Sequence, residues 1–199
     1  MPHYTWNEFL LTWSKKIIGS QEFATFLTQA RNEDSDRYTP DVLASGWLGY
    51  PGATEEEIVA AENRLGIALP PDYREFLQVS NGWRWVNSFI PRLWSVQDIH
   101  WLRVIDPETI NGWNAGWDIG RKLYSGSGED DEIHEQKYLS STLRVSDVEY
   151  AGTAMLLLNP EIVNSSGEWE AWFFAHWVPG ADIYASFWDL MQAFENTIN

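Results

Sequence analysis

The sequence predicts an α+β fold, in which a mostly antiparallel, twisted sheet has helices packed on one side. Three observations support this class. Residues 54–79 carry two strong helix patterns in succession. Apolar runs at residues 154–158 and 169–177, separated by turn residues, indicate a β-hairpin. Further helix patterns lie at both ends of the chain, and helices grouped around hairpin strands are typical of α+β rather than alternating α/β proteins.

Residues 1–45 are expected to form a helical extension that packs on the rest of the chain. Helix N-caps are indicated at Thr5, Ser20 and Thr39. Thr5 and Glu8 have capping-box spacing, and the apolar face of this first helix comprises Trp6, Phe9, Leu10, Trp13 and Ile17. So short a segment cannot bury its own apolar faces. They should therefore pack against a single domain that spans residues 46–199.

Residues 54–83 form the clearest unit, two helices joined by a rigid corner. Thr54 and Glu57 again have capping-box spacing, and Gly66 tolerates the left-handed conformation that ends many helices. Two prolines mark the start of the second helix, where a missing N–H costs nothing, and a Ser-Asn-Gly sequence at residues 80–82 stops it. The expected buried residues are Ile58, Ala61, Leu65, Tyr73, Phe76 and Leu77.

Residues 83–149 give weaker patterns. Residues 83–94 favour extended chain, with Pro91 indicating an edge or a bulge, and Ser95 is placed to cap a short helical turn. Glycine and asparagine interrupt residues 103–118, which we interpret as irregular. Glycine and serine at residues 125–128 then provide a flexible lead into an acidic run.

The C-terminal third returns to clear patterns. On the second hairpin strand, one face comprises Ala171, Phe173 and Ala175, and the other Trp172, Phe174 and His176. Both faces are apolar, so the face opposite the helices needs its own cover, for which residues 101–138 are the simplest candidate. Ser186 is placed to cap a last helix that carries an apolar stripe.

Several short motifs carry a resemblance to a known family. They follow the acidic capped helix in this order: Arg64-Leu65-Gly66, Leu69-Pro70-Pro71-Asp72-Tyr73, Phe76-Leu77 and Ser80-Asn81-Gly82. In order and spacing they resemble the SUKH superfamily, which includes fungal regulators of cell-wall assembly and many bacterial immunity proteins. Residues 45–50 and 186–190 also resemble bacterial members, so the likeness runs from about Gly46 to the C-terminus. Between Trp113 and Glu149 nothing matches.

Composition excludes several classes of protein. There is no cysteine among the 199 residues, which excludes disulfides and thiol chemistry and removes the commonest ligands of structural zinc. The first residues lack the features of a signal peptide, and no apolar run approaches membrane-spanning length, so a cytoplasmic protein with no membrane partner is expected. A formal net charge of −16 would repel nucleic acid. The charge serves either solubility or the attraction of a basic protein partner.

Catalytic chemistry finds little support. The histidines His3, His100, His134 and His176 are scattered and lack the paired spacing of a metalloprotease helix. The acidic run lacks the alternating ligands and fixed glycine of a calcium loop. Fingerprints for nucleotides and for a nucleophile turn are absent. We therefore assign no catalytic residue, metal or cofactor, and expect a protein that is not an enzyme.

Two features are candidates for contact with a partner. The first is the acidic run with its flexible lead, comprising Glu129, Asp130, Asp131, Glu132 and Glu135. The second is an aromatic platform of Trp172, Phe174 and His176, which requires that this sheet face be open. A cover by residues 101–138 is the simpler alternative. The thirteen tryptophans of the chain fit either core positions or interfaces.

The resemblance implies an immunity protein that occludes a co-produced toxin. Such toxins are often nucleases, whose basic substrate groove an acidic surface can fill. The alternative is a regulatory scaffold linked to cell-wall or envelope synthesis, and a third possibility is an acidic hydrolase of envelope glycans. A toxin gene beside this one would favour immunity, whereas an isolated gene would favour regulation.

Overall fold

The computed structural model describes residues 5–29, 37–124, 134–148, 154–175, 177–178 and 180–198. Its centre is a five-stranded sheet with the order β1-β2-β3-β4-β5, in which all neighbours are antiparallel. The strands are β1 (His100–Trp101), β2 (Leu143–Arg144), β3 (Ala154–Val163), β4 (Trp169–Ala175) and β5 (Ala181–Tyr184). The predicted α+β class and the hairpin of β3 and β4 are confirmed.

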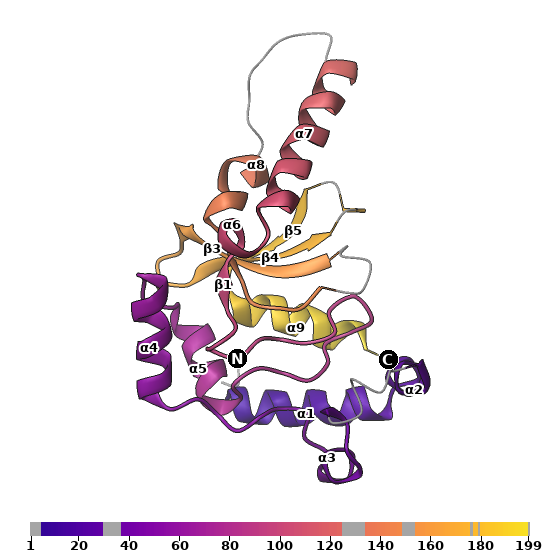
Figure 1. Ribbon diagram of the computed structural model, residues 1–199. Coiled ribbons are helices and arrows are strands. Elements are labelled where there is room, and N and C mark those ends of the chain that lie inside the picture. Colours follow the sequence, from indigo (N-terminus) through magenta and orange to yellow (C-terminus); the bar gives the residue numbers. More distant parts are fainter. Residues whose placement is uncertain are drawn as a thin grey trace.

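Helices cover both faces of this sheet (Figure 1). One side carries α1 (Trp6–Gly19), α2 (Gln21–Gln29), α3 (Pro40–Ser45), α4 (Glu55–Leu65), α5 (Pro71–Val79) and α9 (Phe187–Thr197). The other side carries α6 (Leu102–Ile105), α7 (Pro107–Tyr124), α8 (His134–Tyr138) and the 3-10 turn η2 (Leu139–Ser141). Sequence analysis placed helices on one side only, and the structure adds a second helical layer.

The hairpin strands separate two hydrophobic cores. The larger core takes Ala154, Leu156, Leu158, Ala171, Phe173 and Ala175 from β3 and β4. The smaller core takes Met155, Leu157, Trp172 and Phe174 and adds Leu102, Ile110 and Leu139 from the second helical layer. Side chains alternate along β4 as the pattern predicts, and among the described residues Leu102, Ile110 and Leu139 help to cover the second face.

Helix α7 corrects the prediction that residues 103–118 are irregular. Asp106 accepts the backbone N–H of Thr109 at 3.1 Å, and Pro107 fits the first turn, so the start is well capped. Ile110 enters the smaller core, and the ring of Trp113 lies 4.8 Å from that of Phe174. These two contacts outweigh the low helix propensity of the glycines.

Residues 83–94, expected to be extended, form isolated bridges rather than a strand.

The N-terminal helices share the larger core with the rest of the chain. Both bonds of the capping box at Thr5 and Glu8 are present. The ring of Trp13 stacks on that of Trp83 at 5.4 Å, and the Ser14 hydroxyl accepts the backbone N–H of Leu48. A division at residue 45 stays a prediction.

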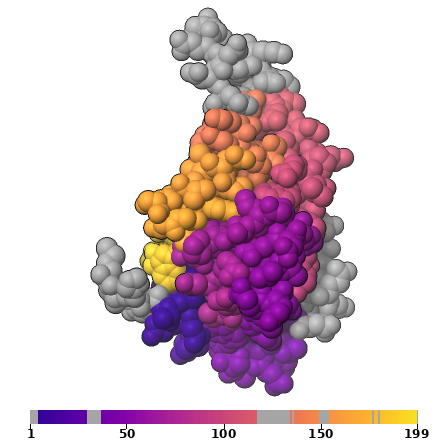
Figure 2. Space-filling view, turned by 90° about the vertical axis from the view of Figure 1, so that its left-hand side faces the viewer, coloured from indigo at the N-terminus to yellow at the C-terminus, as the bar shows by residue number. Residues whose placement is uncertain are grey.

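The pair α4 and α5 forms as predicted. Thr54 and Glu57 make both bonds of the capping box, and Gly66 ends α4 with φ of 76°. All six residues expected in the core are buried, namely Ile58, Ala61, Leu65, Tyr73, Phe76 and Leu77. In Figure 2 residues 40–80 make up much of the surface that faces the viewer. The pair lies on the side of the sheet opposite α7 (Figure 1).

Candidate binding surface

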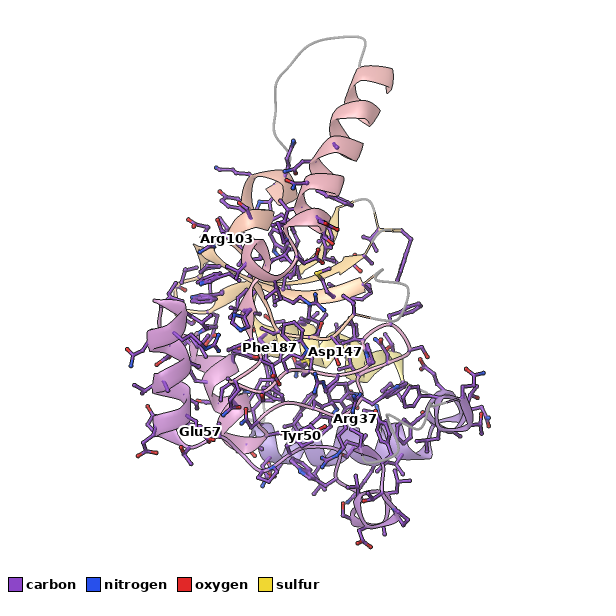
Figure 3. All side chains as sticks on the ribbon, in the orientation of Figure 1. Arg37, Tyr50, Glu57, Arg103, Asp147 and Phe187 are labelled. Carbon is purple, nitrogen blue, oxygen red and sulfur yellow. The ribbon has the colours of Figure 1, made fainter. Side chains whose placement is uncertain are left out.

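A surface cleft of about 410 Å³ opens beside the N-terminal end of α4. Its lining comprises Tyr50, Pro51, Gly52, Glu57, Asn81, Arg92, Leu93, Ser95 and Asp98. These residues come from the loop before α4, from α4 itself and from the loop that joins α5 to β1. Figure 3 shows Tyr50, Glu57 and Asp147, which pairs with Arg92 of the lining, all below the sheet.

The loop before α4 is fixed to the end of α5. The backbone N–H of Tyr50 donates to the Ser80 hydroxyl at 3.0 Å, and that of Ala53 donates to the Leu77 carbonyl at 2.8 Å. A Cβ at Gly52 would lie 1.9 Å from the Gln78 carbonyl oxygen, so only glycine allows this close approach. One wall of the cleft is therefore held by backbone contacts.

The Ser-Asn-Gly sequence at residues 80–82 holds the opposite wall. The Asn81 amide oxygen accepts the backbone N–H of Val96 at 2.8 Å, and its amide nitrogen donates to Gln97. Gly82 has φ of 97°, and a Cβ there would lie 2.8 Å from the Leu93 carbonyl oxygen. These residues stop α5, as predicted, and also build the cleft.

Arginines near the cleft are bonded inward. The Arg64 guanidinium donates to the carbonyl oxygens of Val96 at 2.7 Å and Ile99 at 2.9 Å, which fixes the turn that carries Ser95 and Asp98. The Arg84 guanidinium donates to the carbonyls of Leu48 and Gly49 and lies 4.0 Å from the centre of the Tyr50 ring. Burial lowers the pKa of Arg84. These cations stabilise the loops and leave the nearby carboxylates unmatched.

The aromatic platform does not form an open surface. Trp172 and Phe174 are fully buried in the smaller core, under α6, α7 and η2. The Trp172 ring nitrogen donates to Glu170, which also receives a bond from His134 at 2.8 Å. The two aromatic side chains therefore serve packing, which is the alternative that the sequence analysis gave as simpler. His176 lies outside the described residues.

The acidic run also lies outside the described residues, with Glu129, Asp130, Asp131 and Glu132 among those left out. Of Glu135 the structure describes the backbone, in α8. The flanking helices α7 and α8 lie on the sheet face opposite α4 (Figure 1). Sequence reasoning missed the cleft, although the Ser-Asn-Gly motif could have indicated it.

Within the described parts of the chain, no three His, Asp or Glu side chains gather in a way that could hold a metal ion. No described helix has the length and apolar character needed to cross a membrane.

The structure is thus an α+β domain with a surface cleft, and part of the lining of this cleft comes from the motif-carrying residues 54–82. The chain belongs to the SMI1/KNR4 family (SUKH-1), whose model matches residues 52–193. The resemblance seen in the sequence is thus confirmed, and the match takes in the whole cleft except Tyr50 and Pro51. Helices α1 to α3 precede it. A comparison with curated proteins found no match.

Proposed function

We propose that this protein is a non-catalytic binding protein of the immunity type, which neutralises a basic toxin by direct contact. The observation that carries the proposal is the cleft, whose lining includes the carboxylates of Glu57 and Asp98. A net charge of −16 supports it, because such a surface attracts a basic partner and speeds its association.

The excess of acidic over basic residues supports a basic partner as well. Arg74 is paired with Glu55 and Glu62, and Arg92 with Asp147. Such pairs use up carboxylates too, but with 29 acidic and 13 basic residues in the chain most carboxylates have no cation to pair with. The toxin of this proposal is a protein with a basic groove, for example a nuclease, and the encounter takes place in the cytoplasm.

The test uses the product of the gene that lies next to this one. We expect the two purified proteins to form a complex by size-exclusion chromatography, and co-expression to relieve growth inhibition by the neighbour. Between low and high salt the association rate should fall by about tenfold or more, because added ions screen the attraction between oppositely charged proteins. Absence of binding would instead favour the regulatory scaffold of cell-wall or envelope synthesis.

A further inference from the structure

Two carboxylates of the cleft are held by neutral donors. Glu57 accepts the backbone N–H of Thr54 at 2.8 Å and the side-chain amide of Gln97 at 3.3 Å. Asp98 accepts the Ser95 hydroxyl at 2.8 Å. Neutral donors orient a carboxylate without cancelling its charge. Glu57 and Asp98 are therefore held in position by neutral groups.

The cations nearby do not neutralise these carboxylates. Arg92 also lines the cleft, but its guanidinium is bound by both oxygens of Asp147, at 2.9 and 3.2 Å. His100 is near Asp98, and burial together with the charge of Arg64 lowers the pKa of its imidazole, although Asp98 acts in the opposite direction. Within the described residues, neither Glu57 nor Asp98 has an ion-pair partner. The lining thus holds two carboxylates without an ion pair, beside an arginine that is bonded to Asp147 and is also attracted by the charge of Asp98.

The cleft has the size and the wall to take one long side chain. A volume of about 410 Å³ lies within the range of ligand pockets. Tyr50, half-buried at its edge, already contacts a guanidinium, since Arg84 lies 4.0 Å from the ring centre. Guanidinium groups combine contact with an aromatic ring and bonds to separate carboxylates, which an ammonium group does less well.

We propose that this cleft receives an arginine side chain of the basic partner, with the guanidinium placed between Glu57 and Asp98 and beside Tyr50. The inference rests on the proposed function, because it names the chemistry by which that partner is held. Of the three glutamates in the first turn of α4, Glu55 is paired with Arg74, so Glu56 and Glu57 provide the negative charge at this end of the helix.

The test uses N-acetyl-arginine-N-methylamide as the probe and follows backbone amide shifts by NMR. We expect saturable shifts at Gly52, Asn81 and Ser95, and no comparable shifts with the neutral citrulline analogue. The double variant Glu57→Gln/Asp98→Asn should raise the apparent Kd about tenfold. Equal shifts with citrulline or with the lysine analogue, or an unchanged Kd in the double variant, would overturn the proposal.

The substitutions keep the local structure. A glutamine at position 57 still accepts the Thr54 N–H, as capping boxes allow, and an asparagine at position 98 still accepts the Ser95 hydroxyl. Glu56→Gln is the matched control, because it removes one charge from the same exposed turn outside the cleft. It should leave probe binding within about twofold. The single variants separate the two contributions if the double variant melts early.

Failure of this inference can be told apart from failure of the proposed function. If the neighbouring gene product binds the wild type and the double variant equally, the proposal for the cleft is wrong, whereas the proposal that this protein binds a toxin is retained. If the arginine probe binds the cleft as expected and the neighbouring gene product does not bind at all, the partner proposal fails and the cleft stands.

Discussion

Glu168, which leads into β4, accepts the backbone N–H of Asp72 in the first turn of α5, with 3.2 Å from that nitrogen to each carboxylate oxygen. Pro70 occupies the N-cap of α5 and makes no side-chain bond there. A distant strand thus supplies the cap that the local sequence lacks, and the β-hairpin and the α4–α5 pair are joined at this point.

This cap predicts a dependence of stability on pH. Burial, together with the nearby Asp72, Glu75 and Asp189, raises the pKa of Glu168 to about 7. A raised folded-state pKa means that the stabilising contribution is complete below about pH 4.5 and is lost as the pH rises through 7. The loss is at most about 3 kcal/mol. Burial also raises the pKa of Asp72, which acts in the same direction.

The measurement compares melting temperatures at pH 5 and pH 8. Glu168→Gln keeps an acceptor for the Asp72 N–H but cannot ionise, so its melting temperature should fall less than that of the wild type over this interval. Glu161→Gln, on the exposed end of β3, is the control and should follow the wild type. Parallel curves for wild type and Glu168→Gln would contradict the prediction.

The packing of α4 and α5 predicts a sharp difference between core and cap. Phe76 is fully buried, with rings of Trp6 and Phe187 at 5.5 and 5.2 Å, so Phe76→Asp should prevent folding by burying an unpaired charge. Leu65→Asp should act alike. Thr54→Ala removes one cap and should cost about 1 kcal/mol. Urea unfolding followed by circular dichroism distinguishes these results, and unchanged unfolding of both Asp variants would contradict the fold.

Trp172 is expected to contribute to the stability of the fold. Its ring is fully buried and its nitrogen is bonded to Glu170, so Trp172→Ala should cost about 3–5 kcal/mol, as large core truncations do. Trp172→Phe keeps most of the packing and should cost less. Calorimetry measures both. A Trp172→Ala protein that is as stable as the wild type but dissociates faster from the partner would contradict this prediction and indicate that Trp172 contacts the partner.

Local signals in the sequence were sufficient for α1, α4, α5, α9 and the hairpin. Thr54 and Glu57 lie three residues apart, and their bonds depend on nothing distant. Likewise the alternation along β4 assigned Trp172 and Phe173 to opposite faces. The sequence indicated which residues cover the second sheet face, but not that they form a helix there. Helix α7 is stabilised by the contact of Trp113 with Phe174, on a strand about sixty residues away. The cleft depends on Asn81 meeting Val96, which no periodic pattern encodes.

The N-terminal helices are predicted to be indispensable for folding. Trp6 contacts the rings of Phe187 and Trp188 on α9 at 5.7 and 4.6 Å, and Trp13 stacks on Trp83. Deletion of residues 1–45 would therefore expose a large apolar area, and we expect a lower melting temperature or aggregation. Trp13→Ala tests the same contact in the full chain, with an expected loss of about 3–5 kcal/mol. An undiminished melting temperature after deletion would show that the extension is dispensable.

The acidic run is predicted to govern how fast the partner associates. Its members Glu129, Asp130, Asp131, Glu132 and Glu135 lie within seven residues, next to a glycine-serine segment. Charges at the rim of an interface act mainly on the association rate, whereas buried contacts act on dissociation. Replacing the five carboxylates by their amides should slow association and reduce its dependence on salt, with little change in melting temperature.

The cleft variant Glu57→Gln/Asp98→Asn should instead speed dissociation, because it removes contacts made after docking. Surface-based kinetics at two salt concentrations, with the product of the neighbouring gene, measure both rates. Association by the wild type that does not depend on salt would contradict the electrostatic model, since a partner attracted by this charge must be screened by added ions.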